Sequence, residues 1–436
     1  MLNTAKRLIL PLITASALIA LPSFADESSS SKDPLNGQLP LQELRNFTEI
    51  FERIRTSYVE EIDDTTLLQY AIDGMLTSLD PHSAYLQPED FSDLQENTTG
   101  KFGGLGIEVG QQDGLILVVT PIDETPAQKA GIKAGDLIVS LDGEAVMGMS
   151  LNDAVERMRG EPGTDITLEV RRKNEKELLT FTLTRAEIKV ASVRTEKMNG
   201  DIGYVRITQF QENTGGELAQ AIEDWQTNGK LNGIILDLRN NPGGVLDAAV
   251  EVVDSFISQG LIVYTKGRNP NAELSYSATQ HTPAGSIPTV VLINGGSASA
   301  SEIVAGALQD HQRAVIVGTQ SFGKGSVQSV LPITEDRAVK LTTARYFTPN
   351  GRSIQAQGIR PDIWVEQSEV KSSEQRFYKE ADLPGHLSNP TDAEEVTEGS
   401  EKAPEIVSEL LKRDFQLYEA HTLLRGVSIL SPRPES

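Results

Sequence analysis

The sequence has 436 residues, a formal net charge of −23 at pH 7 and no cysteine. This length allows two or three domains with ordinary hydrophobic cores, and the absence of cysteine excludes a disulfide framework and a lipid anchor on a mature N-terminal cysteine. The acidic surface disfavours nucleic-acid phosphates and anionic lipid headgroups as partners, so we expect no nucleic acid to bind and take the charge as a device for solubility.

Residues 1–25 have the pattern of a secretory signal peptide. Lys6 and Arg7 precede the apolar run Leu8–Leu21, and small residues lie around Ala25, where a signal peptidase would cut. The run is too short and too interrupted for a stable membrane span, although a retained anchor is the alternative. We therefore expect an exported protein.

Residues 26–98 are expected to form a flexible leader followed by a helical arm. The leader, to about residue 39, is rich in Ser, Asp, Lys and Pro. Apolar residues at steps of three and four then predict a helix, and a second helical stretch, residues 66–79, ends at Asp80-Pro81 because proline cannot continue a helix. The apolar stripe of the first helix consists of Leu44, Phe47, Phe51, Ile54 and Tyr58. Such an arm packs either on its own chain or on a partner, and the sequence leaves both open.

Residues 99–188 contain short alternating strands, one helix and many glycines, in an order that resembles a PDZ domain. The glycines of Gly103–Ile107 allow successive backbone N–H groups to converge on a carboxylate, and the strand that starts at Ile107 can accept an extended peptide. Ser150 caps a helix that supplies an apolar second wall. The expected peptide-binding residues are Gly104, Leu105, Gly106, Ile107 and Val155.

Residues 189–367 alternate strand-like and helical runs, which predicts an α/β core. The clearest strands are residues 203–207, 233–238, 289–293 and 314–317. Residues 368–436 are expected to form a polar linker, to about Ala403, and a last amphipathic helix. The apolar residues of that helix are Ile406, Val407, Leu410, Leu411, Leu417 and Tyr418.

A small-residue turn in the core is a candidate for nucleophilic chemistry. The turn Asn294–Gly296 joins a buried strand to a helix that opens with Ser297–Ser301. This arrangement places a hydroxyl and unpaired N–H groups at a helix N-terminus, which favours the negative charge of a tetrahedral intermediate. Three serines compete for the role, and a serine-rich helix start on its own is more often a cap than a nucleophile.

A lysine between two glycines is the second candidate. Lys324, flanked by Gly323 and Gly325 and beside Phe322, is unusual for a solvated lysine and predicts close backbone approach and desolvation. The spacing from Gly318 approaches that of a phosphate loop. However, Gly325 stands where a magnesium-binding Ser or Thr belongs, and the residues that follow predict a strand instead of the required helix, so phosphate binding is disfavoured.

Together these segments resemble the carboxyl-terminal processing peptidases, the tail-specific serine peptidases, from about Leu41 to about Ile363. Three further segments, Asp80–Tyr85, Asp237–Gly244 and Tyr346–Gly351, carry the resemblance in the same order. The resemblance implies a nucleophile at Ser299, a general base at Lys324, an orienting amide at Gln328, and oxyanion donors in the Gly243–Gly244 turn and at the Ala300 N–H. Glu302 matches an acidic position of the family whose role the sequence does not give.

A lysine base requires an unusual environment. A lysine in water has a pKa of about 10.4, whereas a catalytic base works best near roughly 7 to 8, so burial must lower the pKa. The histidines offer no better base, because all five lie outside the matched catalytic segments, and we expect each to be structural or on the surface. They are His82, His281, His311, His386 and His421.

We therefore predict an α+β multidomain protein. The resemblance implies a helical N-terminal arm, a PDZ-like domain inserted in an α/β core of the ClpP/crotonase-like kind, and a helical C-terminal tail. The expected function is that of a periplasmic serine endopeptidase that cleaves proteins near their C-termini. The alternative is a non-catalytic PDZ scaffold. An acyl-thioester enzyme on the related core fold is disfavoured because it does not need a peptide-reading domain.

The expected partners follow from the same reading. Protein substrates would bind through their C-termini, and, as in some relatives, an outer-membrane lipoprotein adaptor would deliver them. We expect a homo-oligomer that associates through the terminal helical regions, the alternative being that each region packs on its own chain. No metal-ligand cluster is evident in the sequence, so no metal or other cofactor is expected.

Overall fold

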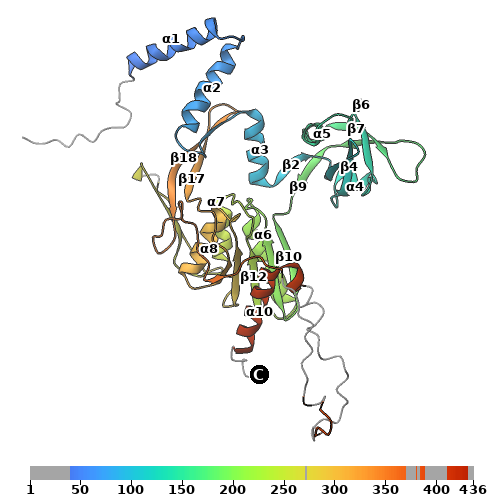
Figure 1. The fold of residues 1–436 in the computed structure, drawn as a ribbon, viewed down its shortest axis with the longest axis vertical. Coiled ribbons are helices and arrows are strands. Elements are labelled where there is room, and N and C mark those ends of the chain that lie inside the picture. Colours follow the sequence, from blue (N-terminus) through green and yellow to red (C-terminus); the bar gives the residue numbers. More distant parts are fainter. Residues whose placement is uncertain (1–39, 271–272, 370–379, 381–382, 388–409, 431–436) are drawn as a thin grey trace, which may run out of the picture. The chain divides into compact units, whose positions relative to one another are not determined.

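The structure is a computed structural model that describes residues 40–270, 273–369, 380, 383–387 and 410–430 (Figure 1). The predicted signal peptide, the flexible leader, Ile406 and Val407 lie outside the described residues. The chain divides into two compact units, Met1–Ala71 and Ile72–Ser436, which are described separately. Among the described residues, no helix combines the length and apolar character that a membrane span requires.

The first unit contains α1 (Leu41–Ser57) and the first half of α2 (Asp64–Thr77). Both helices were predicted, the first from its apolar periodicity and the second as residues 66–79, two residues later than α2 at each end. The apolar stripe of α1 is not buried by the described part of the chain, since no residue of this helix is buried and the side chain of Phe47 is 46% exposed. A helix with an uncovered apolar stripe has no tertiary packing to stabilise it within the unit.

A six-stranded sheet forms the centre of the second unit. Its order is β10-β11-β12-β15-β16-β19, and every neighbouring pair is parallel except β10 with β11. The strands are β10 (Val193–Met198), β11 (Ile202–Ile207), β12 (Gly233–Asp237), β15 (Thr289–Ile293), β16 (Val315–Gly318) and β19 (Ile363–Trp364). All four strands predicted for the core are confirmed within one residue.

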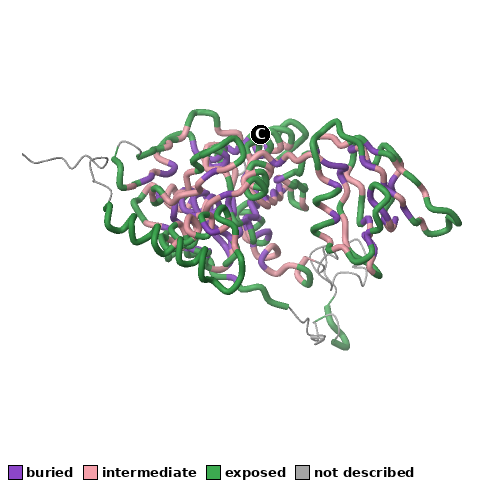
Figure 2. The backbone as a smooth tube through the Cα atoms, turned by 90° about the horizontal axis from the view of Figure 1, so that it is seen from above, coloured by how far each residue is buried: buried purple, intermediate pink, exposed green. Residues whose placement is uncertain are grey.

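Helices cover both faces of this sheet. Ile234 and Leu236 of β12 pack in the core that also contains residues of α6 (Thr214–Thr227), α7 (Leu246–Asp254) and α8 (Ala300–Asp310). Ile235, between them, packs instead in the core under α10 (Phe415–Leu430). Successive side chains of a strand point to opposite faces, so a sheet covered on both sides needs strands that are apolar throughout. The residues of β12 and β15 are buried throughout, and Figure 2 shows buried stretches gathered in the interior of the tube.

The predicted last helix is interrupted at Asp414. Leu410 and Leu411 are helical as expected, in residues 410–413, and α10 then runs from Phe415 to Leu430. Asp414 explains the start of α10, because its carboxylate accepts the N–H of Leu417 at 3.1 Å and its carbonyl accepts the N–H of Tyr418. An aspartate in this position caps a helix N-terminus, so a new helix begins directly after it.

A second sheet joins distant parts of the chain, and only its strand at residues 326–332 was predicted from the sequence. Its path is β1-β18-β13-β14, and β17 also pairs with β18. The strands are β1 (Ala84–Leu86), β13 (Leu261–Gly267), β14 (Ser275–Ser277), β17 (Ser326–Pro332) and β18 (Ala338–Phe347), and α3 (Pro88–Thr99) follows β1. Since β17 is a strand, the structure also rejects the phosphate loop.

The PDZ-like segment is a β-rich domain entered and left through a two-stranded neck. In the neck, β2 (Lys101–Gly104) pairs with β9 (Ala186–Lys189), and Gly104 lies opposite Ala186. The domain's sheet has the order β3-β4-β5-β7-β8, with β6 on β5. Its elements are β3 (Ile107–Gln112), β4 (Leu115–Pro121), α4 (Pro126–Lys129), β5 (Leu137–Leu141), β6 (Glu144–Ala145), α5 (Leu151–Met158), β7 (Asp165–Arg171) and β8 (Leu179–Thr184).

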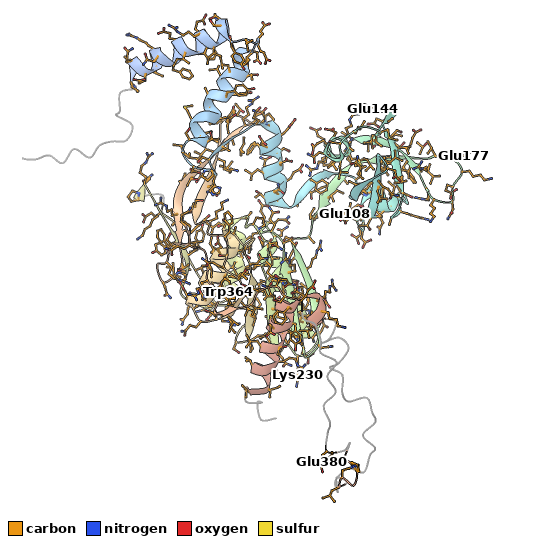
Figure 3. The ribbon with its side chains drawn as sticks, viewed as in Figure 1. Glu108, Glu144, Glu177, Lys230, Trp364 and Glu380 are labelled. Carbon is orange, nitrogen blue, oxygen red and sulfur yellow. The ribbon has the colours of Figure 1, made fainter. Side chains whose placement is uncertain are left out.

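The domain has its own hydrophobic core and a charged outer surface. Leu105, Ile116 and Val118 are among the buried core residues. Glu108, Glu144 and Glu177 are exposed, as Figure 3 illustrates. The predicted helix start is confirmed, because the hydroxyl of Ser150 accepts the N–H of Asp153 and the Asp153 carboxylate accepts the N–H of Ser150.

Candidate active site

A sharp turn between β15 and α8 carries Ser299. All of β15 is buried, and Ser299 is the N-cap of α8 with φ 55° and ψ −112°. A positive φ is unfavourable for a serine, and such backbone strain is found most often where function requires it. The N–H of Ala300 is the first of α8, and the first N–H groups of a helix have no acceptor within the helix.

The three competing serines have different surroundings. Ser297 and Ser301 are fully buried, and their hydroxyls donate to the carbonyls of Leu238 at 2.8 Å and Asn241 at 2.9 Å. These hydroxyls hold the turn to the end of β12. Ser299 is only half-buried, so of the three it is the serine whose side chain solvent or a substrate can reach.

The carboxylate of Glu302 joins the serine turn to the lysine segment. Glu302 is fully buried, and its Oε2 accepts the N–H of Ser299 and the N–H of Lys324, both at 2.8 Å. Its Oε1 accepts the N–H of Gly323 and the hydroxyl of Ser321, both at 2.6 Å. Four donors satisfy a buried charge that would otherwise be costly, and hydrogen bonds to a carboxylate are strong. The role that the sequence left open is therefore to hold two segments together.

The two glycines beside Lys324 allow the close backbone approach that the sequence predicts. A Cβ atom on Gly325 would lie 2.4 Å from the backbone nitrogen of Gln355, and one on Gly323, whose φ is 95°, would lie 3.1 Å from that of Gln357. Phe322 does not contribute to desolvation, because its side chain points to solvent and is 66% exposed.

The lysine itself is desolvated. Burial lowers the pKa of Lys324 from that of an ordinary lysine, and the positive charge of Lys340 lowers it further, while the nearby carboxylate of Glu302 opposes the shift. Both effects favour the neutral amine, which is the form that can accept a proton. Lys340 lies on β18 and comes near the site because β17 and β18 pair.

Gln328, on β17, has a defined amide orientation. Its Nε2 donates to the hydroxyl of Ser326 at 2.8 Å and to that of Thr342 at 3.4 Å. Since the nitrogen end of the amide faces these two hydroxyls, Oε1 is the end left to accept a hydrogen bond.

A glycine turn after β12 backs onto Ser299. A Cβ atom on Gly243, whose φ is 106°, would lie 2.9 Å from the Cβ of Ser299 and 3.1 Å from the nitrogen of Ala300. On Gly244, with φ 142°, it would lie 2.0 Å from the carbonyl oxygen of Phe210, so both positions require glycine. The N–H of Gly243 already donates to Asn241 Oδ1 at 2.9 Å.

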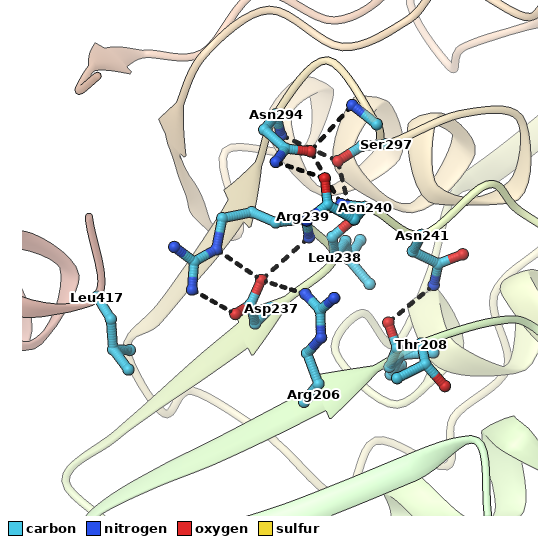
Figure 4. A network of polar contacts seen from close by, with 12 residues as sticks. Arg206, Thr208, Asp237, Leu238, Arg239, Asn240, Asn241, Asn294, Ser297 and Leu417 are labelled. Atoms are coloured by element: carbon cyan, nitrogen blue, oxygen red, sulfur yellow. Dashed lines mark hydrogen bonds and ion pairs between the residues drawn. The ribbon is translucent and has the colours of Figure 1, made fainter. Parts of the chain in front are cut away.

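Buried ion pairs and paired amides fix this turn (Figure 4). Asp237, the last residue of β12, accepts hydrogen bonds from Arg206 at 2.8 Å and from Arg239 at 2.6 Å. Burial raises the pKa of Asp237, but the two guanidinium groups outweigh it and hold the pKa below its usual value. Asn240 and Asn294 exchange hydrogen bonds, each at 2.9 Å, which ties the glycine turn to the serine turn.

One histidine lies nearer the site than the sequence suggested. Burial lowers the pKa of His82, and the charges of Lys324 and Lys340 lower it further, so its ring is within electrostatic reach of the lysine. His311 and His421 are structural as expected, since each ring contacts a backbone carbonyl, that of Leu261 or Asn199.

Comparison with known proteins places the chain in a family. Residues 201–365 match peptidase family S41, residues 117–172 match the PDZ domain, and residues 16–90 match the N-terminal domain of the activating protease CtpB. The chain is 50% identical over 396 residues to a carboxy-terminal-processing protease of Bartonella bacilliformis, with 90% of each protein covered. The chain belongs to peptidase family S41.

The chain is also similar to two further processing proteases. The carboxy-terminal processing protease CtpB of Bacillus subtilis is 37% identical over 328 residues, which cover 74% of this chain and 68% of that protein. The solved structure of a photosystem II D1 C-terminal processing protease is 32% identical, with a TM-score of 0.45, covering 75% of this chain and 87% of the other. The family matches and the Bartonella bacilliformis relative confirm the prediction of a carboxyl-terminal processing serine peptidase with a PDZ domain, and the fold is α+β as expected.

Proposed function

We propose that the protein is a periplasmic endopeptidase that cleaves proteins near their C-termini with a Ser299–Lys324 pair. One observation carries this proposal: the backbone N–H groups of Ser299 and Lys324 both donate to the same oxygen atom of Glu302. The two residues are therefore held close together. The accessible side chain of Ser299 and the lowered pKa of Lys324 support a nucleophile and a general base, respectively.

In the proposed reaction, neutral Lys324 Nζ takes the proton of Ser299 Oγ while Oγ bonds to the carbonyl carbon of the substrate. The lysine returns this proton to the leaving amine as the C–N bond breaks, and water then hydrolyses the acyl-enzyme by the same steps. Gln328 Oε1 accepts a hydrogen bond from Nζ and so turns the lone pair of the amine toward Ser299.

We assign stabilisation of the oxyanion to the N–H of Ala300 and to the Gly243–Gly244 turn. The position of the turn behind Ser299 and the place of Ala300 at the start of α8 support this assignment. The N–H of Gly243 donates to Asn241, so it must break this hydrogen bond before it can donate to the oxyanion. The N–H of Gly244 can donate to the oxyanion without breaking that bond.

The PDZ domain would bind the substrate's C-terminus. In the described structure β3 forms one edge of the domain's sheet, so an extended peptide can add to it as a further strand. Gly106, with φ 74°, lies so close to Thr125 that a Cβ would be 2.3 Å away, and the carbonyls of Leu105 and Gly106 accept N–H groups of the domain. Ile107 and Val155 are partly buried against the domain's core, as groove-lining residues would be, and Gly104 ends the neck before this loop.

A reactive-serine probe separates this function from the scaffold alternative. The protein without residues 1–25 is incubated with casein and, separately, with a fluorophosphonate, and the labelled residue is located by mass spectrometry. A peptidase cleaves casein and is labelled at Ser299, and a latent peptidase is labelled even if casein survives. A protein that binds C-terminal peptides but is neither labelled nor active would be a scaffold.

Excision of the PDZ domain is expected to reduce both rate and selectivity. Because Gly104 and Ala186 are opposite each other in the neck, residues 105–185 can be replaced by a short Gly-Ser linker without stretching the chain. Cleavage of peptides that differ only in a free or amidated C-terminus measures the effect. The full chain should prefer the free terminus, and the excised protein should not. If the excised protein keeps the wild-type rate and the preference for a free C-terminus, the PDZ domain does not take part in substrate recognition.

The pH dependence of cleavage should report the environment of Lys324. The neutral amine is active, so kcat/KM should rise with pH through a pKa below that of an ordinary lysine. Lys340→Gln removes a neighbouring positive charge, which raises the pKa of Lys324, and the rising limb should move to higher pH. The exposed Lys230 provides the control, Lys230→Gln, whose profile should match the wild type. If the rising limb of the Lys340→Gln profile lies at the same pH as in the wild type, the charge of Lys340 does not lower the pKa of the catalytic base.

Export and self-association complete the proposal. Cleavage after Ala25, read from the mass of the protein recovered from the periplasm, tests export.

The uncovered apolar stripe of α1 supports a homo-oligomer, with a lipoprotein adaptor as a further partner. Light scattering should give a multiple of the protomer mass, and Phe47→Glu should reduce it. A monomeric wild type would exclude self-association.

A further inference from the structure

The turn before β1 holds a carboxylate with an unusual set of donors. Asp80 Oδ1 accepts the N–H groups of His82 at 2.8 Å and Ser83 at 2.9 Å, and Oδ2 accepts the hydroxyl of Ser83 at 2.8 Å. A fourth donor comes from the far end of the chain, the hydroxyl of Thr342 at 3.1 Å. Burial raises the pKa of Asp80, but these hydrogen bonds outweigh it, so the group is an anion that can only accept.

The register of β1 on β18 brings these residues together. Ala84 pairs with Lys340, and the N–H of Thr342 donates to the hydroxyl of Ser83 at 3.2 Å. On the other side of β18, Gln328 of β17 lies opposite Thr342. Thr342 therefore lies between Asp80 and Gln328, with its side chain bonded to both.

The single hydroxyl hydrogen of Thr342 decides the direction of this chain of hydrogen bonds. Asp80 has no hydrogen to offer, so Thr342 must donate to it and can only accept from Gln328. The amide of Gln328 must then present Nε2 to Thr342, which leaves Oε1 as the acceptor at its other end. Without the carboxylate, the hydroxyl of Thr342 would be free to donate to Oε1, and the amide of Gln328 could turn over.

We propose that Asp80 is a positioning residue for the general base, acting on Lys324 through Thr342 and Gln328. The inference rests on the proposed roles of Lys324 and Gln328. The acceptor-only carboxylate keeps Oε1 of Gln328 available to the amine, and loss of this constraint allows Nε2 to face the amine instead, where it repels the N–H groups of Lys324. Asp80 lies three residues after the end of α2 at Thr77, so the turn that follows this helix sets the orientation of the Gln328 amide.

Substitutions that remove one member of this chain of hydrogen bonds test the relay. Asp80→Ala and Thr342→Val should lower kcat by roughly 10- to 100-fold, a usual cost of losing the partner that orients a functional side chain, with little change in KM. Thr342→Ser retains the hydroxyl and should restore most of the rate. Asp90→Asn, at an exposed aspartate of α3, is the control and should match the wild type.

A double-mutant cycle with Gln328→Ala distinguishes a relay from a structural effect. If Asp80 acts through Gln328, then Asp80→Ala should cause no further loss in the Gln328→Ala protein. Losses that multiply independently would overturn the relay, and so would equal rates for Thr342→Val and Thr342→Ser. Ser299→Ala is assayed alongside. Full cleavage by that variant would overturn the dyad and the relay with it, whereas loss in Ser299→Ala with a normal Asp80→Ala would overturn the relay alone.

Discussion

Ser299→Ala and Lys324→Ala should each reduce casein cleavage by roughly 10⁴-fold or more, as removal of a nucleophile or its base does in other serine peptidases. Neither substitution removes a stabilising contact of the turn. The bonds that hold Ser299 and Lys324 to Glu302 come from backbone N–H groups, which an alanine retains. Thermal unfolding midpoints should therefore stay within a few degrees of the wild type, and removal of a desolvated lysine should if anything stabilise the fold.

Lys324→Arg is the sharper form of this test. An arginine keeps a long cationic side chain but cannot lose its proton in a protein, so it cannot act as a base and should be as inactive as the alanine variant. Lys230→Ala, at an exposed lysine, should cleave at the wild-type rate. A normal rate for Lys324→Ala would remove the lysine from the mechanism.

Glu302→Gln is expected to lower both activity and stability, although Glu302 touches no substrate in the proposed reaction. An amide has one acceptor oxygen, so its NH₂ end would face two of the four donors that the carboxylate now satisfies. Each buried hydrogen bond to a charged group contributes about 1.5–3 kcal/mol, so a loss of at least about 3 kcal/mol in the free energy of unfolding is expected. Cleavage should fall at least about 100-fold, because small displacements of catalytic groups have effects of this size.

Urea unfolding and kcat/KM, measured on the same preparation, check this prediction. The exposed glutamate of β10 offers a matched control, Glu196→Gln, which should change neither quantity. A Glu302→Gln protein that is as stable and as active as the wild type would show that the carboxylate does not hold the two segments in place.

The parts of the site that the sequence predicted are those formed by neighbouring residues. A buried strand, a small-residue turn and a helix start lie within about a dozen residues around Ser299, so the local sequence pattern is enough to predict them. The glycines beside Lys324 carry the same kind of local signal. The choice of Ser299 over Ser297 and Ser301 came from family resemblance, and the burial of the other two hydroxyls gives it a physical basis.

The parts that the sequence could not predict depend on contacts between distant segments. The carboxylate of Glu302 gathers donors 3 to 22 positions away along the chain, and no periodicity indicates which of them converge. Asp80 and Thr342 are 262 positions apart, and they meet only because β1 pairs with β18, a pairing that no local pattern predicted. His82 was set aside for the same reason. Its proximity to Lys324 follows from the pairing of β1 with β18.

The position of α10 in the chain has a consequence for the timing of biosynthesis. The sheet that carries the serine and glycine turns is covered on one face by α10, whose buried residues include Ala420 and Leu424. Arg239, which leads into the glycine turn, is bonded to Asp414 at 2.8 Å just before that helix. While a chain is still leaving the ribosome and residues 410–430 have not been made, this apolar face is bare and Arg239 lacks its partner. The structure that supports the turns of Ser299 and Gly243 is thus completed only after α10 has been synthesised, about 110 residues after the serine turn.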